Sequence, residues 1–219
     1  MNTVTIILLS LILLGAIISF YRRRIFGTPI LRFFPFFLLF QFTYQLAAYL
    51  YSFVFTEHAS NYFIFNITLP LNMAYFSLMF YEIIKHPLKR RLIAVGAVAN
   101  LLFYAVNIVF LQGFFALMTY SRTMMAVTVV VYSLFYFHEM LTSEVGNEKN
   151  PTRDATFWIV TAIFFFYLCS TLTIIAWDYL RINNEIIGPS MVRVFGFLLY
   201  SMYIVGIVLH KAENKEPIA

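Results

Sequence analysis

Long apolar runs separated by short polar stretches dominate this sequence. Seven runs are long enough to cross a membrane: residues 3–20, 31–55, 62–83, 92–112, 117–138, 155–176 and 190–210. A transmembrane helix needs about 20 predominantly apolar residues for a hydrocarbon core of about 30 Å. The longest connection, near 139–154, is too short for a soluble domain of about 50 residues. The pattern therefore predicts an all-α, polytopic membrane protein whose single domain, residues 1–219, is a seven-transmembrane helix bundle.

Composition supports a protein that is solvated by lipid. Hydrophobic residues make up 62% of the 219 residues and charged residues 11%, whereas soluble domains are about 25% charged. The mean hydropathy is +0.81. The first run has no basic residue before it and ends in "YRRR" without a small-residue cleavage site. We therefore expect a retained helix and not a signal peptide.

The basic residues predict the orientation of the bundle. If the N-terminus lies outside, twelve of the fifteen lysines and arginines fall on the inner side. They are Arg22, Arg23, Arg24, Arg32, Lys85, Lys89, Arg90, Arg91, Lys149, Arg153, Lys211 and Lys215. The positive-inside rule then predicts a multi-pass inner-membrane protein with the N-terminus outside and the C-terminus cytoplasmic. The net charge of +5 is a topology signal, so we expect membrane lipids and no nucleic acid as partners.

Polar residues inside the runs recur at helical spacing. They are Gln41, Gln45 and Ser52 in the second run; Thr68, Asn72, Tyr75 and Glu82 in the third; Asn100, Tyr104 and Asn107 in the fourth; and Arg193, Tyr200, Tyr203 and His210 in the seventh. Such groups either join helices through hydrogen bonds of about 0.6 to 2 kcal/mol each or line a polar cavity. The spacing alone leaves both interpretations open.

Arg122 and Arg193 are the sharpest polar signal. They lie sixteen and seventeen residues before His138 and His210, about 24 to 26 Å along the helix axis, and so at similar height near the outer side. One interpretation is that they extend to lipid headgroups or pair with an outer acid, for which the candidates are Glu57, Asp178 and Glu185. The other is that they bind a carboxylate or phosphate in a cavity open to the outside. The predicted ligand-binding set is Arg122, Arg193, Asn72, Gln45, Asn107 and Tyr200.

Several local features give further expectations. Pro35 should lie in the first turns of the second helix, Pro70 should kink the third, and Asp154 should cap the sixth. Trp158 and Trp177 are spaced to sit at opposite membrane interfaces. The histidines His86, His138 and His210 fall at helix ends without metal-ligand spacing, and no hydrolase, NTPase or protease motif is present. We expect no catalytic residue, metal or cofactor.

Three segments carry a family resemblance. "YRRR" after the first run, "NYFIFNITLPLNMAYFSLMFYEII" as the third and "NPTRDATFWIVTAIFFFYLCSTL" at the sixth resemble small seven-helix Bacteroidetes proteins of unknown function. In that group the sixth run opens with Asn-Pro, followed by Phe-Trp-Ile and then a Tyr. The matching residues are Asn150, Pro151, Phe157, Trp158, Ile159 and Tyr167. Related modules occur with histidine kinases, so the resemblance implies a sensory role.

These observations favour a non-enzymatic sensor or receptor-like module. It would bind a small or lipidic ligand from the outer side and signal through a cytoplasmic partner on its basic face. The alternative is a small-molecule transporter that uses the polar residues as a pathway, and a third hypothesis is an intramembrane enzyme with an unrecognised site. The sequence leaves the oligomeric state open.

Overall fold

The predicted helices are present in the computed structural model, which describes residues 3–54, 61–142, 151–175 and 187–210. These ranges are helical and contain no strand. Seven of their helices are long and apolar enough to cross a membrane. These are α1 (Thr3–Tyr21), α3 (Phe34–Val54), α4 (Tyr62–Ile83), α5 (Pro87–Val106), α6 (Thr119–Thr142), α8 (Ala155–Ile175) and α10 (Ile187–Leu209). The structure thus confirms the helical bundle, while the orientation of its termini stays a prediction.

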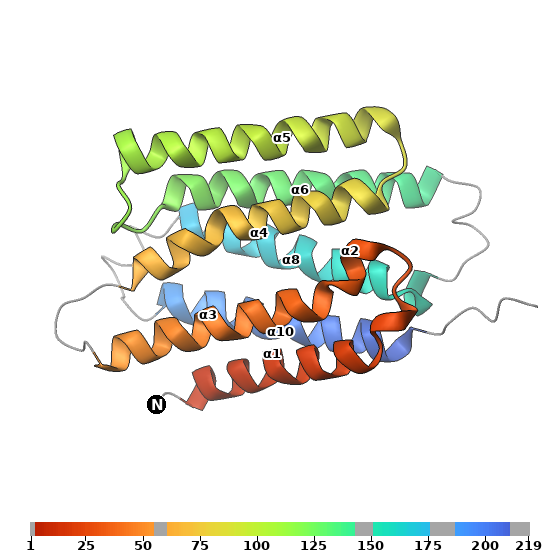
Figure 1. Cartoon of the computed structure of the whole chain (residues 1–219), viewed down its shortest axis with the longest axis horizontal. Coiled ribbons are helices and arrows are strands. Elements are labelled where there is room, and N and C mark those ends of the chain that lie inside the picture. The colour runs from red at the N-terminus through yellow and green to blue at the C-terminus, as the bar shows by residue number, and fades with distance from the viewer. Residues whose placement is uncertain (1–2, 55–60, 143–150, 176–186, 211–219) are drawn as a thin grey trace, which may run out of the picture.

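Six of these helices form a closed ring. In spatial order the ring runs α1, α3, α4, α6, α8 and α10, after which α10 packs again on α1. The remaining helix, α5, lies outside the ring against α4 and α6, at the upper edge of the bundle in Figure 1. Large buried side chains such as Phe34, Phe80 and Tyr203 fill the interior, and many other large apolar residues are exposed on the outer faces. An apolar outer surface is what lipid solvation requires.

The basic residues gather at one end of the bundle, which we call the basic end. Its members among the described residues are Arg22, Arg23, Arg24, Arg32, Lys85, Lys89, Arg90, Arg91 and Arg153. In Figure 1 this end lies on the right, where α1 ends and α5 begins. Arg122 lies in the first turn of α6, which begins at the opposite end.

The second predicted span, residues 31–55, is divided by a proline. A short helix, α2 (Pro29–Arg32), precedes α3, which begins at Phe34. Pro35 has no N–H with which to continue the hydrogen-bond ladder from α2. The N–H of Phe33, the last residue before α3, donates to the Ile30 carbonyl at 3.0 Å and closes α2. Pro35 lies in the first turn of α3, as predicted, but the helix starts three residues later than expected.

The fourth predicted span, residues 92–112, begins earlier than the apolar pattern indicates. The structure starts α5 at Pro87, a favoured residue at the first helical position. Its first two turns contain Lys89, Arg90 and Arg91, which a hydropathy window leaves out because they are charged. The helix continues as a π-helical segment, η2 (Asn107–Leu111). The remaining boundaries differ by four residues or fewer, with α6 extending to Thr142.

Two polar contacts involve residues that the sequence marked as a helix cap and a helix kink, Asp154 and Pro70. Asp154 Oδ1 accepts the N–H of Thr156 at 2.9 Å, which confirms Asp154 as the cap of α8. Pro70 lies inside α4, which continues from Tyr62 to Ile83, and its kink stays a prediction. Because Pro70 lacks an N–H, the Asn66 carbonyl loses its helical partner. The Tyr104 hydroxyl of α5 donates to that carbonyl at 3.0 Å.

Close packing joins α8 to α10 near the basic end. A Cβ at Gly206 of α10 would overlap the Cβ of Trp158 on α8. Only glycine permits this approach of the two helices. The Trp158 indole Nε1 donates to the Thr152 carbonyl at 2.8 Å, while its predicted counterpart, Trp177, lies outside the described residues.

Candidate functional site

Polar side chains of three ring helices meet in hydrogen-bonded pairs. Gln41 Nε2 of α3 donates to Asn72 Oδ1 of α4 at 2.7 Å. One turn along α3, Gln45 Nε2 donates to the Tyr200 hydroxyl of α10 at 3.2 Å. The Tyr44 side chain interacts with those of Gln45 and Asn72. The structure therefore brings three predicted site residues, Gln45, Asn72 and Tyr200, into one cluster around Tyr44.

Further tyrosines extend this cluster along the inside of the ring. Tyr167 of α8 is near enough to Tyr44 and Tyr200 to interact with them electrostatically. The Tyr203 ring lies beside the Tyr200 ring, with 5.9 Å between their centroids. Tyr75 of α4 is within the same reach of Tyr203. Hydroxyl groups from α3, α4, α8 and α10 thus share the interior. We call the five residues Tyr44, Tyr75, Tyr167, Tyr200 and Tyr203 the tyrosine cluster.

The aromatic rings around the cluster leave one hydroxyl without a partner. Phe37 stacks on the Tyr75 ring at a centroid distance of 3.9 Å, and Phe76 meets the Tyr167 ring edge-on at 5.5 Å. The Tyr75 hydroxyl is buried and has no hydrogen-bond partner among the described residues. A buried unsatisfied hydroxyl costs free energy, and the Tyr75 hydroxyl does not repay that cost by joining two helices through a hydrogen bond.

Arg122 turns into the bundle beside this cluster. Its Nη2 donates to Asn66 Oδ1 at 3.5 Å, and its guanidinium carbon lies 5.7 Å from the centroid of the Phe65 ring. Tyr44, Tyr62 and Tyr167 lie within its electrostatic reach. The side chain is half-buried, and its Nε is buried without a hydrogen-bond partner in the described part of the chain.

Arg122 has no ion pair with any residue that the structure describes. The acids predicted as its partners, Glu57, Asp178 and Glu185, all lie outside the described residues. Its described neighbours are instead an amide, a phenyl ring and phenol groups. Among them only neutral oxygen atoms can accept a hydrogen bond from the guanidinium, so its charge is available to an anion.

Asn66 positions Arg122, although Asn66 is not in the ligand-binding set that the sequence predicted. Its side chain is fully buried, and its Nδ2 donates to the carbonyl oxygens of Phe114 and Ala116 at 2.7 Å each. This ties the connection between η2 and α6 to α4 and turns Oδ1 toward Arg122. The signal in the sequence is an amide inside an apolar run, one turn before Pro70.

Asn107 lies apart from the central cluster. Its Nδ2 donates to the Ser121 hydroxyl at 2.7 Å and to Gln112 Oε1 at 3.1 Å. Gln112 in turn donates to the Thr119 hydroxyl at 2.7 Å. These contacts hold the turn between η2 and α6. Asn107 therefore supports the start of the helix that carries Arg122 and does not join Gln45, Asn72 and Tyr200.

Arg122 and Arg193, which the sequence placed at similar height as candidate anion ligands, contact no common residue in the part of the chain that the structure describes. Arg193 is half-buried on α10, and α8 lies between α6 and α10 in the ring. Arg193 makes no hydrogen bond or ion pair with another described residue. The structure thus brings Arg122 close to Tyr44 and its partners and leaves Arg193 as a separate basic position.

The histidines that the structure describes have neighbours at the helix ends. His210 Nδ1 accepts the N–H of Ala155 at 3.0 Å and lies 3.8 Å from Asp154 Oδ1. His138 Nδ1 lies 3.1 Å from Lys89 Nζ. The described ranges contain no group of three or more His, Cys, Asp or Glu side chains that could hold a metal ion.

Comparisons of the chain with protein families, with curated proteins and with solved structures found no match. The resemblance to small seven-helix Bacteroidetes proteins therefore stays a prediction.

Proposed function

We propose that this chain is an inner-membrane, receptor-like module that binds an anionic small or lipidic ligand from the outer side. The observation that carries the proposal is the environment of Arg122. Its guanidinium turns inward among Asn66, Phe65 and tyrosine hydroxyls, with no ion pair in the described part of the chain. A cation held inside a membrane bundle is costly and is found mainly where it serves a substrate, ion or ligand.

The neighbouring groups suit a carboxylate or a phosphate. A guanidinium presents donors in a planar fork that matches two oxygen atoms of either anion. The hydroxyls of Tyr44 and Tyr167 lie close enough to Arg122 to interact with it electrostatically, and they can donate further hydrogen bonds to a bound anion. Beyond them, Gln45, Asn72 and Tyr200 offer amide and hydroxyl groups to the rest of the ligand.

A receptor binds its ligand on one side of the membrane and signals on the other, and the two ends of the bundle suit these two steps. Under the positive-inside rule the basic end is cytoplasmic, so α6 begins on the outer side and Arg122 is reached from there. Ligand contact with side chains of several ring helices gives a means of changing their packing. We propose that a cytoplasmic signalling partner docks on the basic end and detects that change.

A thermal-shift experiment tests the ligand site. The probes are dodecanoate, dodecyl phosphate and succinate, added to the protein in a neutral detergent, with dodecanol as the uncharged control. An anion at about one hundred times its dissociation constant adds about 2.7 kcal/mol to the stability of the folded state. At least one anionic probe should raise the melting temperature of the wild type.

Two variants and a control locate the effect. Arg122→Ala should weaken binding by about tenfold or more, because it removes a charge-assisted hydrogen bond. Arg193→Ala determines whether the second predicted arginine also contacts the ligand. The control is Arg91→Ala, an exposed position at the basic end. An unchanged shift in Arg122→Ala would show that the anion binds elsewhere and would overturn the proposal.

The alternative function is transport of a small molecule along the tyrosine cluster. Its supporting observation is that polar groups continue from Arg122 through Tyr44, Tyr167 and Tyr200 to Tyr203, along the inside of the ring. Flux of the same probes into proteoliposomes would favour transport. Binding without flux, together with a signalling protein that co-purifies only in the presence of the probe, would favour the receptor.

A further inference from the structure

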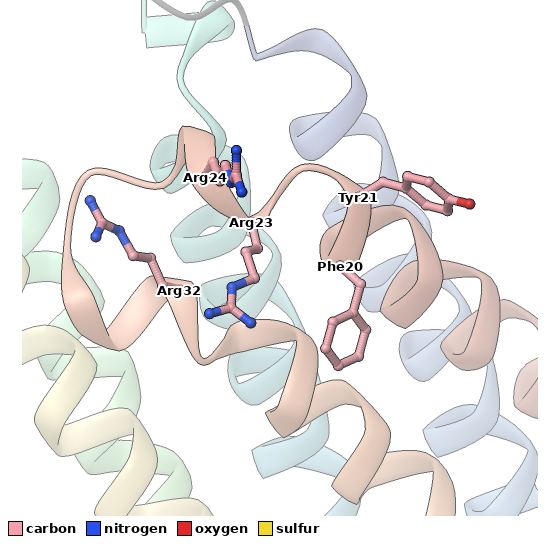
Figure 2. Close-up of a pocket in the computed structure, with 5 residues that line it drawn as sticks. All are labelled: Phe20, Tyr21, Arg23, Arg24 and Arg32. Atoms are coloured by element: carbon pink, nitrogen blue, oxygen red, sulfur yellow. The ribbon is translucent and has the colours of Figure 1, made fainter.

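The connection between α1 and α3 forms an open pocket at the basic end. The pocket has a volume of about 600 Å³ and is lined by Phe20, Tyr21, Arg23, Arg24 and Arg32. Figure 2 shows the three arginine side chains arranged around the loop that follows α1, with the Phe20 ring beside Arg23. The lining therefore combines three cations with two aromatic rings and contains no acid.

This connection is anchored to the rest of the bundle. Phe26 and Leu31 within it are buried, with 2% and 1% of their surface exposed. The N–H of Ile30 donates to Glu82 Oε2 of α4 at 3.0 Å. Arg32 Nε donates to the Phe26 carbonyl at 3.2 Å, across the loop. The backbone that carries the arginines is thus held before any ligand arrives, which lowers the entropy lost on binding.

The arginines of the segment "YRRR" divide into two roles. Arg22 turns toward α10, where its Nη1 donates to the carbonyl oxygens of Ile207 at 2.6 Å and Val208 at 2.7 Å. It thereby satisfies carbonyls at the end of that helix, which have no partner within it. Arg23 and Arg24 are exposed and line the pocket instead.

The charges in the pocket are not neutralised by the part of the chain that the structure describes. Arg23, Arg24 and Arg32 form no ion pair with a described residue. The guanidinium carbon of Arg23 lies 5.9 Å from the centroid of the Phe36 ring. Within the loop, Arg32 donates a hydrogen bond only from Nε. Their remaining donors are the groups that proteins use to bind phosphate oxygens.

An apolar surface adjoins these cations on the membrane side. Ile17 and Phe20 of α1 are 47% and 36% exposed, and Phe36 of α3 is 44% exposed. The Phe20 and Phe36 rings pack edge-on at 4.9 Å between centroids. We propose that the pocket binds the phosphodiester headgroup of an anionic glycerophospholipid, with its acyl chains along this face of α1 and α3. This site is separate from Arg122, which lies in the first turn of α6, at the opposite end of the bundle.

Titration by native mass spectrometry of the full chain in neutral detergent tests the proposal. The probes are phosphatidylglycerol, with phosphatidylcholine as the zwitterionic lipid and glycerol 3-phosphate as the free phosphate ester. The pocket variant is Arg23→Gln/Arg24→Gln/Arg32→Gln. The matched control, Lys85→Gln/Arg91→Gln/Arg153→Gln, removes the same charge from exposed positions at the same end. Because Arg32 also supports the loop, a second pocket variant, Arg23→Gln/Arg24→Gln, keeps the hydrogen bond from Arg32 to the Phe26 carbonyl.

The expected result is selective loss of the anionic lipid. Both pocket variants should bind phosphatidylglycerol about tenfold more weakly or worse than wild type, since each loses at least two guanidinium groups that donate to the phosphodiester, and a hydrogen bond to a charged group contributes about 1.5 kcal/mol or more, a factor of about ten. The control variant should keep wild-type affinity. Equal weakening in the control, wild-type affinity in the pocket variants, or equal affinity for phosphatidylcholine would each overturn the proposal. Displacement of the lipid by an equal concentration of glycerol 3-phosphate would assign the pocket to free phosphate esters instead.

Discussion

Arg122 shows what a single polar residue in an apolar run can and cannot reveal. Charged residues are rare inside transmembrane helices, so its position in the sequence marked it as a candidate site. The contacts to Asn66 and Phe65 depend on how α6 packs on α4, and periodicity along one helix does not determine that packing. Asn66 was missed for the same reason, because its role depends on the carbonyls of Phe114 and Ala116.

Removing the charge of Arg122 should stabilise the free protein. In Arg122→Met an apolar chain of similar length replaces a guanidinium that has no described ion pair and whose Nε is buried without a partner. Burial of an uncompensated charge costs several kcal/mol, and part of this cost is offset by Asn66 and the aromatic ring. We expect the free energy of unfolding to rise by about 1 to 2 kcal/mol, measured without ligand in detergent.

The exposed Arg91→Met is the control for this substitution, because a general effect of lost positive charge would appear there too. A lower stability of Arg122→Met than of wild type would show that Arg122 already has an adequate partner within the chain. An anionic ligand would then not be needed to balance the charge of Arg122. Higher stability together with lost anion binding is the combination expected of a functional residue.

At the scale of the helices, the apolar runs predicted the number and type of the membrane-spanning helices well and their first and last residues less well. Hydropathy identified seven spans because lipid imposes a minimum apolar length. It misplaced the start of α5, because Lys89, Arg90 and Arg91 are helical although charged. It also did not separate α2 from α3, since that break depends on one missing N–H at Pro35. The polar faces were predicted, but the pairing of Gln45 with Tyr200 required the order of helices in the ring.

The contact between α4 and α5 can be tested through Pro70. Tyr104→Phe removes the hydroxyl that donates to the Asn66 carbonyl, which Pro70 leaves without its helical partner. We expect this substitution to lower the free energy of unfolding by about 1 kcal/mol. In a Pro70→Ala background the residue at position 70 regains its N–H and can bond the same carbonyl. Tyr104→Phe should then cost about half as much or less, as a double-mutant cycle would measure.

An equal cost of Tyr104→Phe in both backgrounds would contradict this account, because the hydroxyl would then act independently of the missing amide. Tyr120→Phe serves as a control for loss of a tyrosine hydroxyl, since its side chain is 57% exposed. It should leave the free energy of unfolding within about 0.5 kcal/mol of the wild-type value.

At the scale of the whole molecule, the two proposed sites lie toward opposite ends of one ring. Arg122 is in the first turn of α6, whereas Arg23, Arg24 and Arg32 surround the pocket at the basic end. The helices α3, α4, α8 and α10 that hold the tyrosine cluster run between these ends. Anionic lipid at the basic end would lie along α3 beside Phe36, and an anion near Arg122 would lie beside Tyr44 of the same helix, so α3 links the two sites physically.

The proposed route, from an outer ligand to a cytoplasmic partner, depends on the predicted orientation, which cysteine labelling can establish. Cys169 is the only cysteine, so Cys169→Ser provides a cysteine-free background. Arg91→Cys and Phe115→Cys then place single thiols at the basic end and in the connection before α6, where the native side chains are exposed. With the N-terminus outside, a membrane-impermeant maleimide should label Phe115→Cys in intact spheroplasts and Arg91→Cys only after the membrane is opened. The reverse pattern would place Arg122 on the cytoplasmic side, and ligand entry from outside would then be wrong whatever anion the protein binds.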